Sequence, residues 1–185
     1  MVIIMLKKLN LDQIRHIHNT YMTEDFPADE LKPLSSIERM LTAGVYSCYA
    51  LYDGEELLAY AYLVEYKGYV LVDYFAVSKK RRGEGIGTRV ISLLKELLAG
   101  KTILIECEDV AFSNDGAEEN IRKRRIAFYE KAGFTLSGVK TKLFDVRYVI
   151  LSYPEVDNVD KAVGRVYSVM LSKEHYNKDF EIYNK

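Results

Sequence analysis

The spacing of apolar residues along the chain predicts an alternation of short strands and amphipathic helices. Strand-like runs occupy about 2–8, 46–52, 57–66, 70–78, 102–107, 134–144 and 146–153. Apolar residues at helical spacing predict helices at about 11–21, 36–44, 90–98, 118–132 and 156–171. The polar end of the chain, 172–185, is predicted to be frayed.

Turn signals between these runs indicate how the strands connect. Asp53-Gly54 and Lys67-Gly68 separate three successive strands, which are therefore predicted to form an antiparallel meander. A helix links the third of these strands, 70–78, to the strand at 102–107. Such a crossover makes the two strands parallel neighbours.

The segment between the third strand and its helix carries the most specific chemistry. It reads Arg82-Gly83-Glu84-Gly85-Ile86-Gly87-Thr88. A strand, a glycine turn and a helix place bare backbone N–H groups at a helix N-terminus, where they bind phosphate. The spacing differs from the dinucleotide G-x-G-x-x-G pattern, and a P-loop would need a lysine after its last glycine. A phosphorylated cofactor of another type is therefore predicted.

Two motifs together indicate which cofactor this is. The Arg-x-x-Gly-x-Gly pattern of Arg82, Gly85 and Gly87 resembles the acetyl-CoA pyrophosphate loop of the GNAT superfamily of N-acetyltransferases. The stretch 125–134, with its tyrosine and its terminal Gly-Phe, resembles a later helix of that family. The resemblance covers about 3–153. It implies an α/β (α+β) fold with a mixed, mostly antiparallel sheet of six to seven strands, a parallel central strand pair and helices on both faces.

The same resemblance implies acetyl-CoA as the acetyl donor and assigns residues to its binding. The pyrophosphate is expected at the backbone of 82–88, with charge added by the Arg82 side chain. A backbone N–H of Ala76 or Val77 is expected to polarise the thioester carbonyl. The expected cofactor contacts are Ala76, Val77, Arg82, Gly83, Glu84, Gly85, Ile86, Gly87, Thr88, Arg122, Arg125 and Phe128. Arg122 and Arg125 stand where the family often has Asn and Ala.

Tyr129 occupies the position of the family's general acid. A free phenol has a pKa of about 10 and a thiol one of about 8.5, so proton transfer to the leaving thiolate is uphill by roughly 2 kcal/mol. Arg125 precedes Tyr129 by one helical turn and Arg122 by two. We hypothesise that these cations lower the pKa of Tyr129.

A carboxylate is the usual proton acceptor for the attacking amine. Glu106 and Glu108 alternate on one predicted strand and share a face. Asp73 lies on the neighbouring strand. Clustered carboxylates raise one another's pKa, which suits a base, and the order of preference is Glu106, Asp73, Glu108.

Composition and charge argue against several other classes of protein. The chain of 185 residues has a net charge of −1, which argues against a nucleic-acid partner. Cys48 and Cys107 lie in apolar contexts and are interpreted as buried free thiols. With three histidines and no close Cys/His spacing, no metal site is predicted. No apolar run reaches the length of a membrane helix, so a cytoplasmic protein without membrane contact is expected.

These observations favour one function and leave a second one open. The first is an N-acetyltransferase in which a primary amine attacks the thioester directly, with general acid and base help. The alternative is a non-catalytic acyl-CoA-binding sensor or regulatory module. The acceptor amine belongs to a small molecule or a peptide. Residues 1–155 are predicted to form the cofactor-binding domain, and the appended 156–185 is compatible with a cover over the acceptor groove or with a homodimer contact.

Overall fold

The protein is described by a computed structural model that covers residues 5–28 and 30–184. The described residues form eight strands, hydrogen-bonded in the order β1-β2-β3-β4-β5-β7-β6-β8. The chain divides into two compact units. The first comprises Met1–Val64 and Asp73–Leu97, and the second comprises Glu65–Val72 and Leu98–Lys185.

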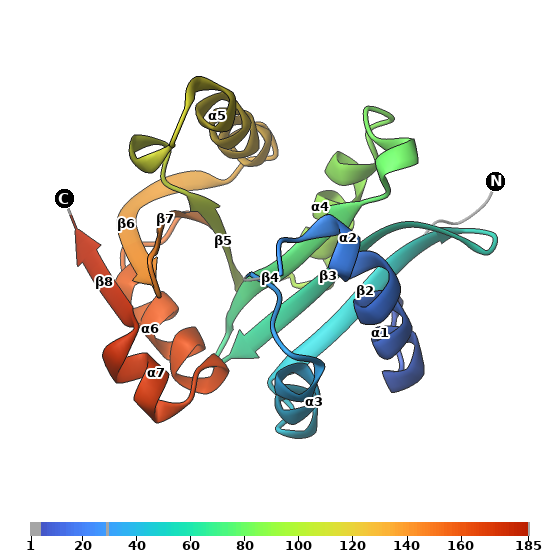
Figure 1. Cartoon of the computed structure of the whole chain (residues 1–185), viewed down its shortest axis with the longest axis horizontal. Helices are drawn as coiled ribbons and strands as arrows, with labels where there is room; N and C mark the ends of the chain where they lie inside the picture. The colour runs from blue at the N-terminus through green and yellow to red at the C-terminus, as the bar shows by residue number, and fades with distance from the viewer. Residues whose placement is uncertain (1–4, 29, 185) are drawn as a thin grey trace. The chain divides into compact units, whose positions relative to one another are not determined.

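The first unit contains most of the N-terminal elements (Figure 1). These are β1 (Lys7–Lys8), α1 (Leu11–Ile17), a π-helical turn (His18–Met22), α2 (Thr23–Asp25), α3 (Leu34–Thr42), β2 (Tyr46–Asp53), most of β3 (Glu56–Tyr66), the second half of β4 (Tyr69–Val77) and α4 (Ile86–Leu97). The predicted helix at 11–21 therefore continues through a π-helical turn. Of the predicted strand at 2–8, residues 2–4 lie outside the described residues.

Local signals account for the main features of this unit. Asp53 pairs with Glu56 across a two-residue turn in which Gly54 has a φ of +58°, so β2 and β3 form the predicted antiparallel hairpin. Asn10 caps α1, because its side chain accepts the Gln13 N–H at 2.9 Å and the Gln13 side chain accepts the Asn10 N–H at 3.0 Å. Seven consecutive residues of β3 are buried, as expected for a strand that is covered on both faces.

The second unit contains the remaining elements. These are the start of β4, β5 (Thr102–Glu108), α5 (Gly116–Lys131), β6 (Thr135–Leu143), β7 (Val146–Tyr153), α6 (Val159–Met170), α7 (Lys173–Lys178) and β8 (Phe180–Asn184). Tyr69–Leu71 pairs in parallel with Thr102–Leu104. This confirms the predicted parallel strand pair, and the fold class is confirmed with it, although the sheet is larger than predicted.

The end of the chain corrects two predictions. The sheet of the described residues has eight strands instead of six to seven, and the supposedly frayed 172–185 contains α7 and β8. Strand β8 pairs antiparallel with β6 at the edge of the sheet (Figure 1). The Phe180 ring stacks on the Tyr167 ring of α6 with 4.1 Å between the centroids. The polar composition was misleading because the partners that order this segment lie far away in the sequence.

Both cysteines are buried free thiols, as predicted. Burial raises the pKa of Cys107 to about 12 and that of Cys48 still further, which keeps both thiols protonated. Within residues 5–28 and 30–184, no helix is long and apolar enough to cross a membrane. In the same residues, no group of three or more His, Cys, Asp or Glu side chains could hold a metal ion.

Candidate functional site

The glycine turn of the first unit follows directly from the end of β4. The Ser78 N–H donates to the Leu58 carbonyl at 2.8 Å, and a 3₁₀ turn at Lys79–Arg81 then leads away from the strand. Arg82 is extended, and α4 begins at Ile86. The sequence-predicted order of strand, turn and helix is therefore present in the structure.

Two glycines shape this turn. Gly83 has a φ of +87° and Gly85 one of +78°, values that L side chains rarely adopt. No heavy atom lies within 4 Å of a Cβ built on either glycine, so the space above both is open. The first N–H groups of α4 have no intrahelical acceptor, and the helix dipole places partial positive charge on them. The turn therefore presents an accessible backbone surface that suits an anion.

The charged side chains of the turn differ in how firmly they are held. Arg81 contacts the carboxylates of Glu56 and Glu84, each at 2.9 Å. The Arg82 side chain is 58% exposed, donates from Nε to the Val77 carbonyl at 3.3 Å and lies 4.0 Å from Asp25. Arg82 is therefore more exposed than Arg81, whose guanidinium is held by two carboxylates.

Tyr129, the predicted general acid, lies on α5 in the second unit. Asp115 caps this helix by accepting the N–H groups of Ala117 and Glu118. The Tyr129 side chain is buried, and its ring contacts Phe128 and Phe134 edge to face at centroid distances of 5.0 and 5.8 Å. These two ring contacts restrict the direction of the phenol.

The pKa of Tyr129 is shifted in the direction opposite to the one that we hypothesised. Burial raises the pKa of Tyr129 well above its usual value, and the nearby Cys107 raises it further. Arg125 lowers the pKa as predicted, but this attraction is outweighed. The Tyr129 hydroxyl therefore holds its proton more firmly than a free phenol, and it is present as a neutral hydrogen-bond donor.

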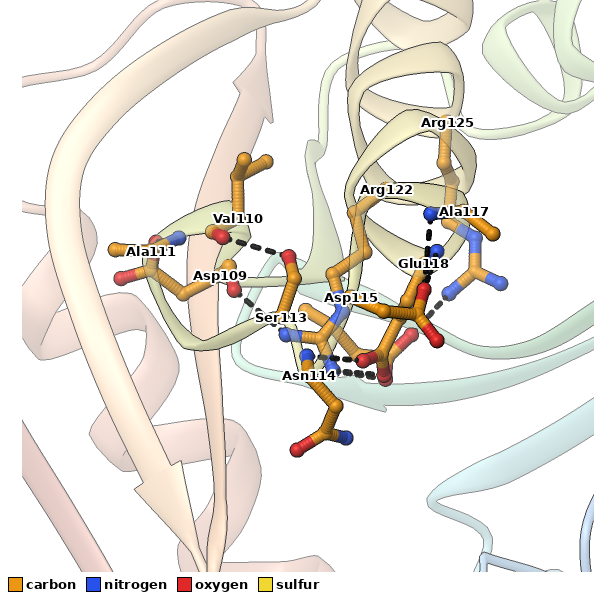
Figure 2. A network of polar contacts seen from close by, with 11 residues as sticks. Asp109, Val110, Ala111, Ser113, Asn114, Asp115, Ala117, Glu118, Arg122 and Arg125 are labelled. Atoms are coloured by element: carbon orange, nitrogen blue, oxygen red, sulfur yellow. Dashed lines mark hydrogen bonds and ion pairs between the residues drawn. The ribbon is translucent and has the colours of Figure 1, made fainter.

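Arg122 lies in a polar network instead of facing solvent (Figure 2). Its guanidinium donates to Glu108 at 3.1 Å, to Glu118 at 2.6 Å and to the Asp109 carbonyl at 2.7 Å. Arg125 contacts the other carboxylate oxygen of Glu108 at 2.9 Å. The fold thus brings two predicted cofactor contacts onto one predicted base. Since two cations hold the Glu108 carboxylate, Glu108 is poorly placed to accept a proton.

Asp109 is a further buried member of this network that sequence reasoning missed. Burial alone would raise the pKa of Asp109, but hydrogen bonds from Lys140 at 2.7 Å and from the Ala111 N–H at 3.0 Å outweigh it, so the pKa is lowered. The ionised carboxylate is therefore more favourable in the folded than in the unfolded chain.

The lowered pKa of Asp109 predicts how its contribution to stability depends on pH. The contribution is complete above the ordinary carboxyl pKa of 3.8 and is lost as the pH falls through the lower folded pKa. We expect the difference in the free energy of unfolding between wild type and Asp109→Asn to be constant near neutrality and to shrink in acid, as measured by urea unfolding at several pH values. Asp145→Asn, at an exposed carboxylate, is the control. An Asp109→Asn difference that stays constant down to pH 3 would contradict the prediction.

Glu106, the preferred base, is held by hydroxyl groups. It accepts the Tyr167 hydroxyl at 2.5 Å and the Thr141 hydroxyl at 3.3 Å. Tyr167 comes from α6 and is fully buried. Sequence reasoning missed this contact, because only the spacing of α6 was visible and not its partner.

Asp73, the remaining candidate base, belongs to the first unit. Its side chain is 5% exposed and contacts Lys32 Nζ at 2.7 Å, while its second oxygen accepts the Tyr46 hydroxyl at 2.5 Å. Both oxygens are therefore engaged. Nothing in the sequence pattern around Lys32 or Tyr46 indicated this contact.

Comparisons with known proteins agree with the motifs. Residues 11–134 match the Acetyltransferase (GNAT) family model. YjbC of Bacillus subtilis (strain 168), which carries an acetyltransferase name, is 32% identical over 114 residues, 61% of this chain. The chain spans 54% of the length of that relative.

Solved structures share the fold. A GNAT-family structure from Bacteroides thetaiotaomicron has a TM-score of 0.71 at 19% identity, over 89% of this chain and 94% of its own. An aminoglycoside N-acetyltransferase solved with coenzyme A has a TM-score of 0.55 at 19% identity, over 83% of this chain and 99% of its own. Because the family model covers most of the chain and includes both the glycine turn and the Tyr129 helix, the chain belongs to the GNAT family of acetyltransferases.

Proposed function

We propose that this protein transfers an acetyl group from acetyl-CoA to a primary amine, which attacks the thioester directly. The observation that carries the proposal is the open glycine turn at the N-terminus of α4, with Gly83 and Gly85 at positive φ. Family membership supports acetyl-CoA as the ligand. Backbone N–H groups of 82–88 hold the pyrophosphate, and the exposed Arg82 guanidinium adds a charge-assisted hydrogen bond.

The reaction needs three further groups in this proposal. A backbone N–H of Ala76 or Val77 stabilises the negative charge that develops on the thioester oxygen. Tyr129 donates a hydrogen bond to the leaving thiolate, and its burial strengthens that bond because the local dielectric constant is low. Glu106 accepts the proton that the amine loses, directly or through water.

The amine attacks as the neutral base, and charge is balanced throughout. Its nitrogen forms the new bond to the acetyl carbon, the carbon–sulfur bond breaks, and the electron pair leaves with sulfur. One proton passes from the nitrogen to Glu106, and one reaches the thiolate through Tyr129. Glu106 then releases its proton to solvent, and Tyr129 regains its proton from solvent. This route requires no covalent enzyme intermediate.

Gly85→Ala tests the ligand of the turn. The new Cβ stands in the open space above the turn and disfavours the positive φ of residue 85. The backbone N–H groups of the turn then no longer point toward the ligand. We expect the affinity for acetyl-CoA, measured by titration calorimetry, to fall about tenfold to 100-fold, the cost of one charge-assisted hydrogen bond or more.

Gly54→Ala is the matched control for this experiment. Gly54 also has a positive φ and open space around its missing Cβ, but it lies in the β2–β3 hairpin turn. The two variants share the backbone strain, and we expect only Gly85→Ala to weaken binding. Equal affinities in both variants, or no heat with acetyl-CoA in the wild type, would overturn the proposed function.

A further inference from the structure

The contact between Lys32 and Asp73 joins a lysine of the α2–α3 connection to a nearly buried carboxylate of β4. Lys32 Nζ lies 2.7 Å from Asp73 Oδ1, and the Asp73 side chain is 5% exposed. Asp73 Oδ2 accepts the Tyr46 hydroxyl at 2.5 Å. The hydroxyl restricts the orientation of the carboxylate, so Oδ1 is left as the place for a cation, and Lys32 occupies it.

An aromatic ring completes the surroundings of this cation. The Tyr74 ring centroid lies 5.0 Å from Lys32 Nζ, within the range of a cation–π interaction. Phe26 and Tyr62 contact the Tyr74 ring edge to face at 5.0 and 6.4 Å, which holds it in place. A carboxylate beside an aromatic face is the combination that recognises an alkylammonium group.

The backbone around Lys32 is anchored independently of its side chain. The Lys32 N–H donates to the Tyr74 hydroxyl at 2.8 Å, and that hydroxyl donates to the Glu30 carbonyl at 2.9 Å. The Lys32 side chain is 23% exposed. The side chain is therefore partly open to solvent, and the backbone that carries it is held by contacts that do not involve the ammonium group.

We infer that Asp73, Tyr46 and Tyr74 form a binding site for a primary alkylammonium group and that Lys32 occupies this site as an internal competitor. The inference rests on the proposed function, because it takes the amine acceptor of that reaction as the ligand of this site. The acceptor enters as an ammonium ion and displaces Lys32, so one cation replaces another and the buried carboxylate stays paired. The ammonium group then releases one proton to solvent before the neutral amine attacks. Asp73 can take part in acetyl transfer only after Lys32 has left, because both of its oxygens are otherwise engaged.

Lys32→Ala tests the inference with n-propylamine as the probe. This amine replaces the atoms that the substitution removes beyond Cβ. We expect calorimetry to show that Lys32→Ala binds n-propylamine about tenfold or more tightly than the wild type. The reason is that the Lys32 ammonium group no longer competes with the amine for one charge-assisted hydrogen bond to Asp73. n-Propanol, which lacks the charge, is expected to bind neither protein.

Two variants serve as controls. Lys101→Ala removes a different lysine, which pairs with Glu65, and it should leave the affinity for n-propylamine at the wild-type value. Lys32→Ala combined with Asp73→Asn removes both charges and should abolish the gain. If Lys32→Ala proves unstable, its melting temperature provides the readout, and n-propylamine should raise it while n-propanol should not.

The outcomes separate this inference from the proposed function. Equal affinities of Lys32→Ala and wild type for n-propylamine, with no rise in melting temperature, would overturn the inference, and binding of acetyl-CoA would be unaffected by that result. Tight binding of n-propylamine that depends on Asp73, followed by release of coenzyme A thiol when acetyl-CoA is added, would support both. The same binding without any affinity for acetyl-CoA would support the ammonium site and overturn the transferase.

Discussion

Tyr129→Phe is expected to lower the rate of acetyl transfer about 1,000-fold, within the range found for removal of a general acid. The substitution deletes only the hydroxyl, and the contacts of the ring with Phe128 and Phe134 keep its orientation. The thiolate then leaves without a hydrogen bond, while the glycine turn, which holds the pyrophosphate in our proposal, is unchanged. We therefore expect kcat to fall and the affinity for acetyl-CoA to remain. Thiol release and titration calorimetry measure the two quantities.

The pH dependence of this effect follows from burial. Because burial raises the pKa of Tyr129 above its usual value of about 10, the hydroxyl stays protonated at every pH below that value. We expect the ratio of wild-type to Tyr129→Phe rates to be constant between pH 6 and pH 9, a range that lies below the pKa of about 10.

A tyrosine elsewhere in the second unit provides the control. Tyr176→Phe, on α7, keeps the ring that packs on Phe180 and should leave the rate unchanged. A Tyr129→Phe rate within threefold of the wild type, well inside the scatter of mutational effects, would show that the hydroxyl has no part in catalysis. The alternative of a non-catalytic acyl-CoA-binding module would instead be favoured by a wild-type protein that binds acetyl-CoA but releases no thiol with amines.

Arg122→Met is expected to lower the free energy of unfolding by about 3–5 kcal/mol, as for removal of one partner of a buried ion pair. The Arg122 side chain is 8% exposed and donates to Glu108, Glu118 and the Asp109 carbonyl (Figure 2). Methionine fills similar volume but leaves these acceptors without their donor. Urea unfolding measures the change as a lower midpoint at an unchanged slope.

Lys123→Met is the matched control on the same helix. Lys123 is 58% exposed and pairs with Glu119 on the surface, so its loss should cost about 1 kcal/mol or less. Similar losses in Arg122→Met and Lys123→Met would show that the Arg122 network adds no more than a surface ion pair. The Nε of Arg122 has no hydrogen-bond partner among the described residues, and the resulting desolvation cost lowers the net contribution of Arg122 to stability.

The features that sequence alone predicted are those with local causes. Asp53-Gly54 specifies a two-residue hairpin, Asn10 and Gln13 cap a helix, and the glycines before α4 require a positive φ that their neighbours cannot adopt. Apolar spacing placed the remaining helices and most of the strands within a few residues. The same local patterns carried the resemblance to the GNAT family, because the glycine turn is made by consecutive residues.

The contacts that decide the chemistry of each carboxylate are not local. Lys32 is 41 residues from Asp73, and Tyr167 is 61 residues from Glu106. The apolar stripe of α6 was visible in the sequence, but the hydroxyl of Tyr167 gave no sign of its partner. Likewise, β8 is only five residues long, and its partner β6 lies far away in the sequence.

Sequence by itself determined the elements, the glycine turn before α4 and the family of this protein, because each depends on residues that are close along the chain. Tertiary structure alone decided that Glu108 is held by two arginines, that Asp73 is paired with Lys32 and that burial outweighs Arg125 at Tyr129. The physical reason is that charge pairing and desolvation depend on which segments fold against one another. The periodicity of apolar residues along the sequence does not indicate which segments these are.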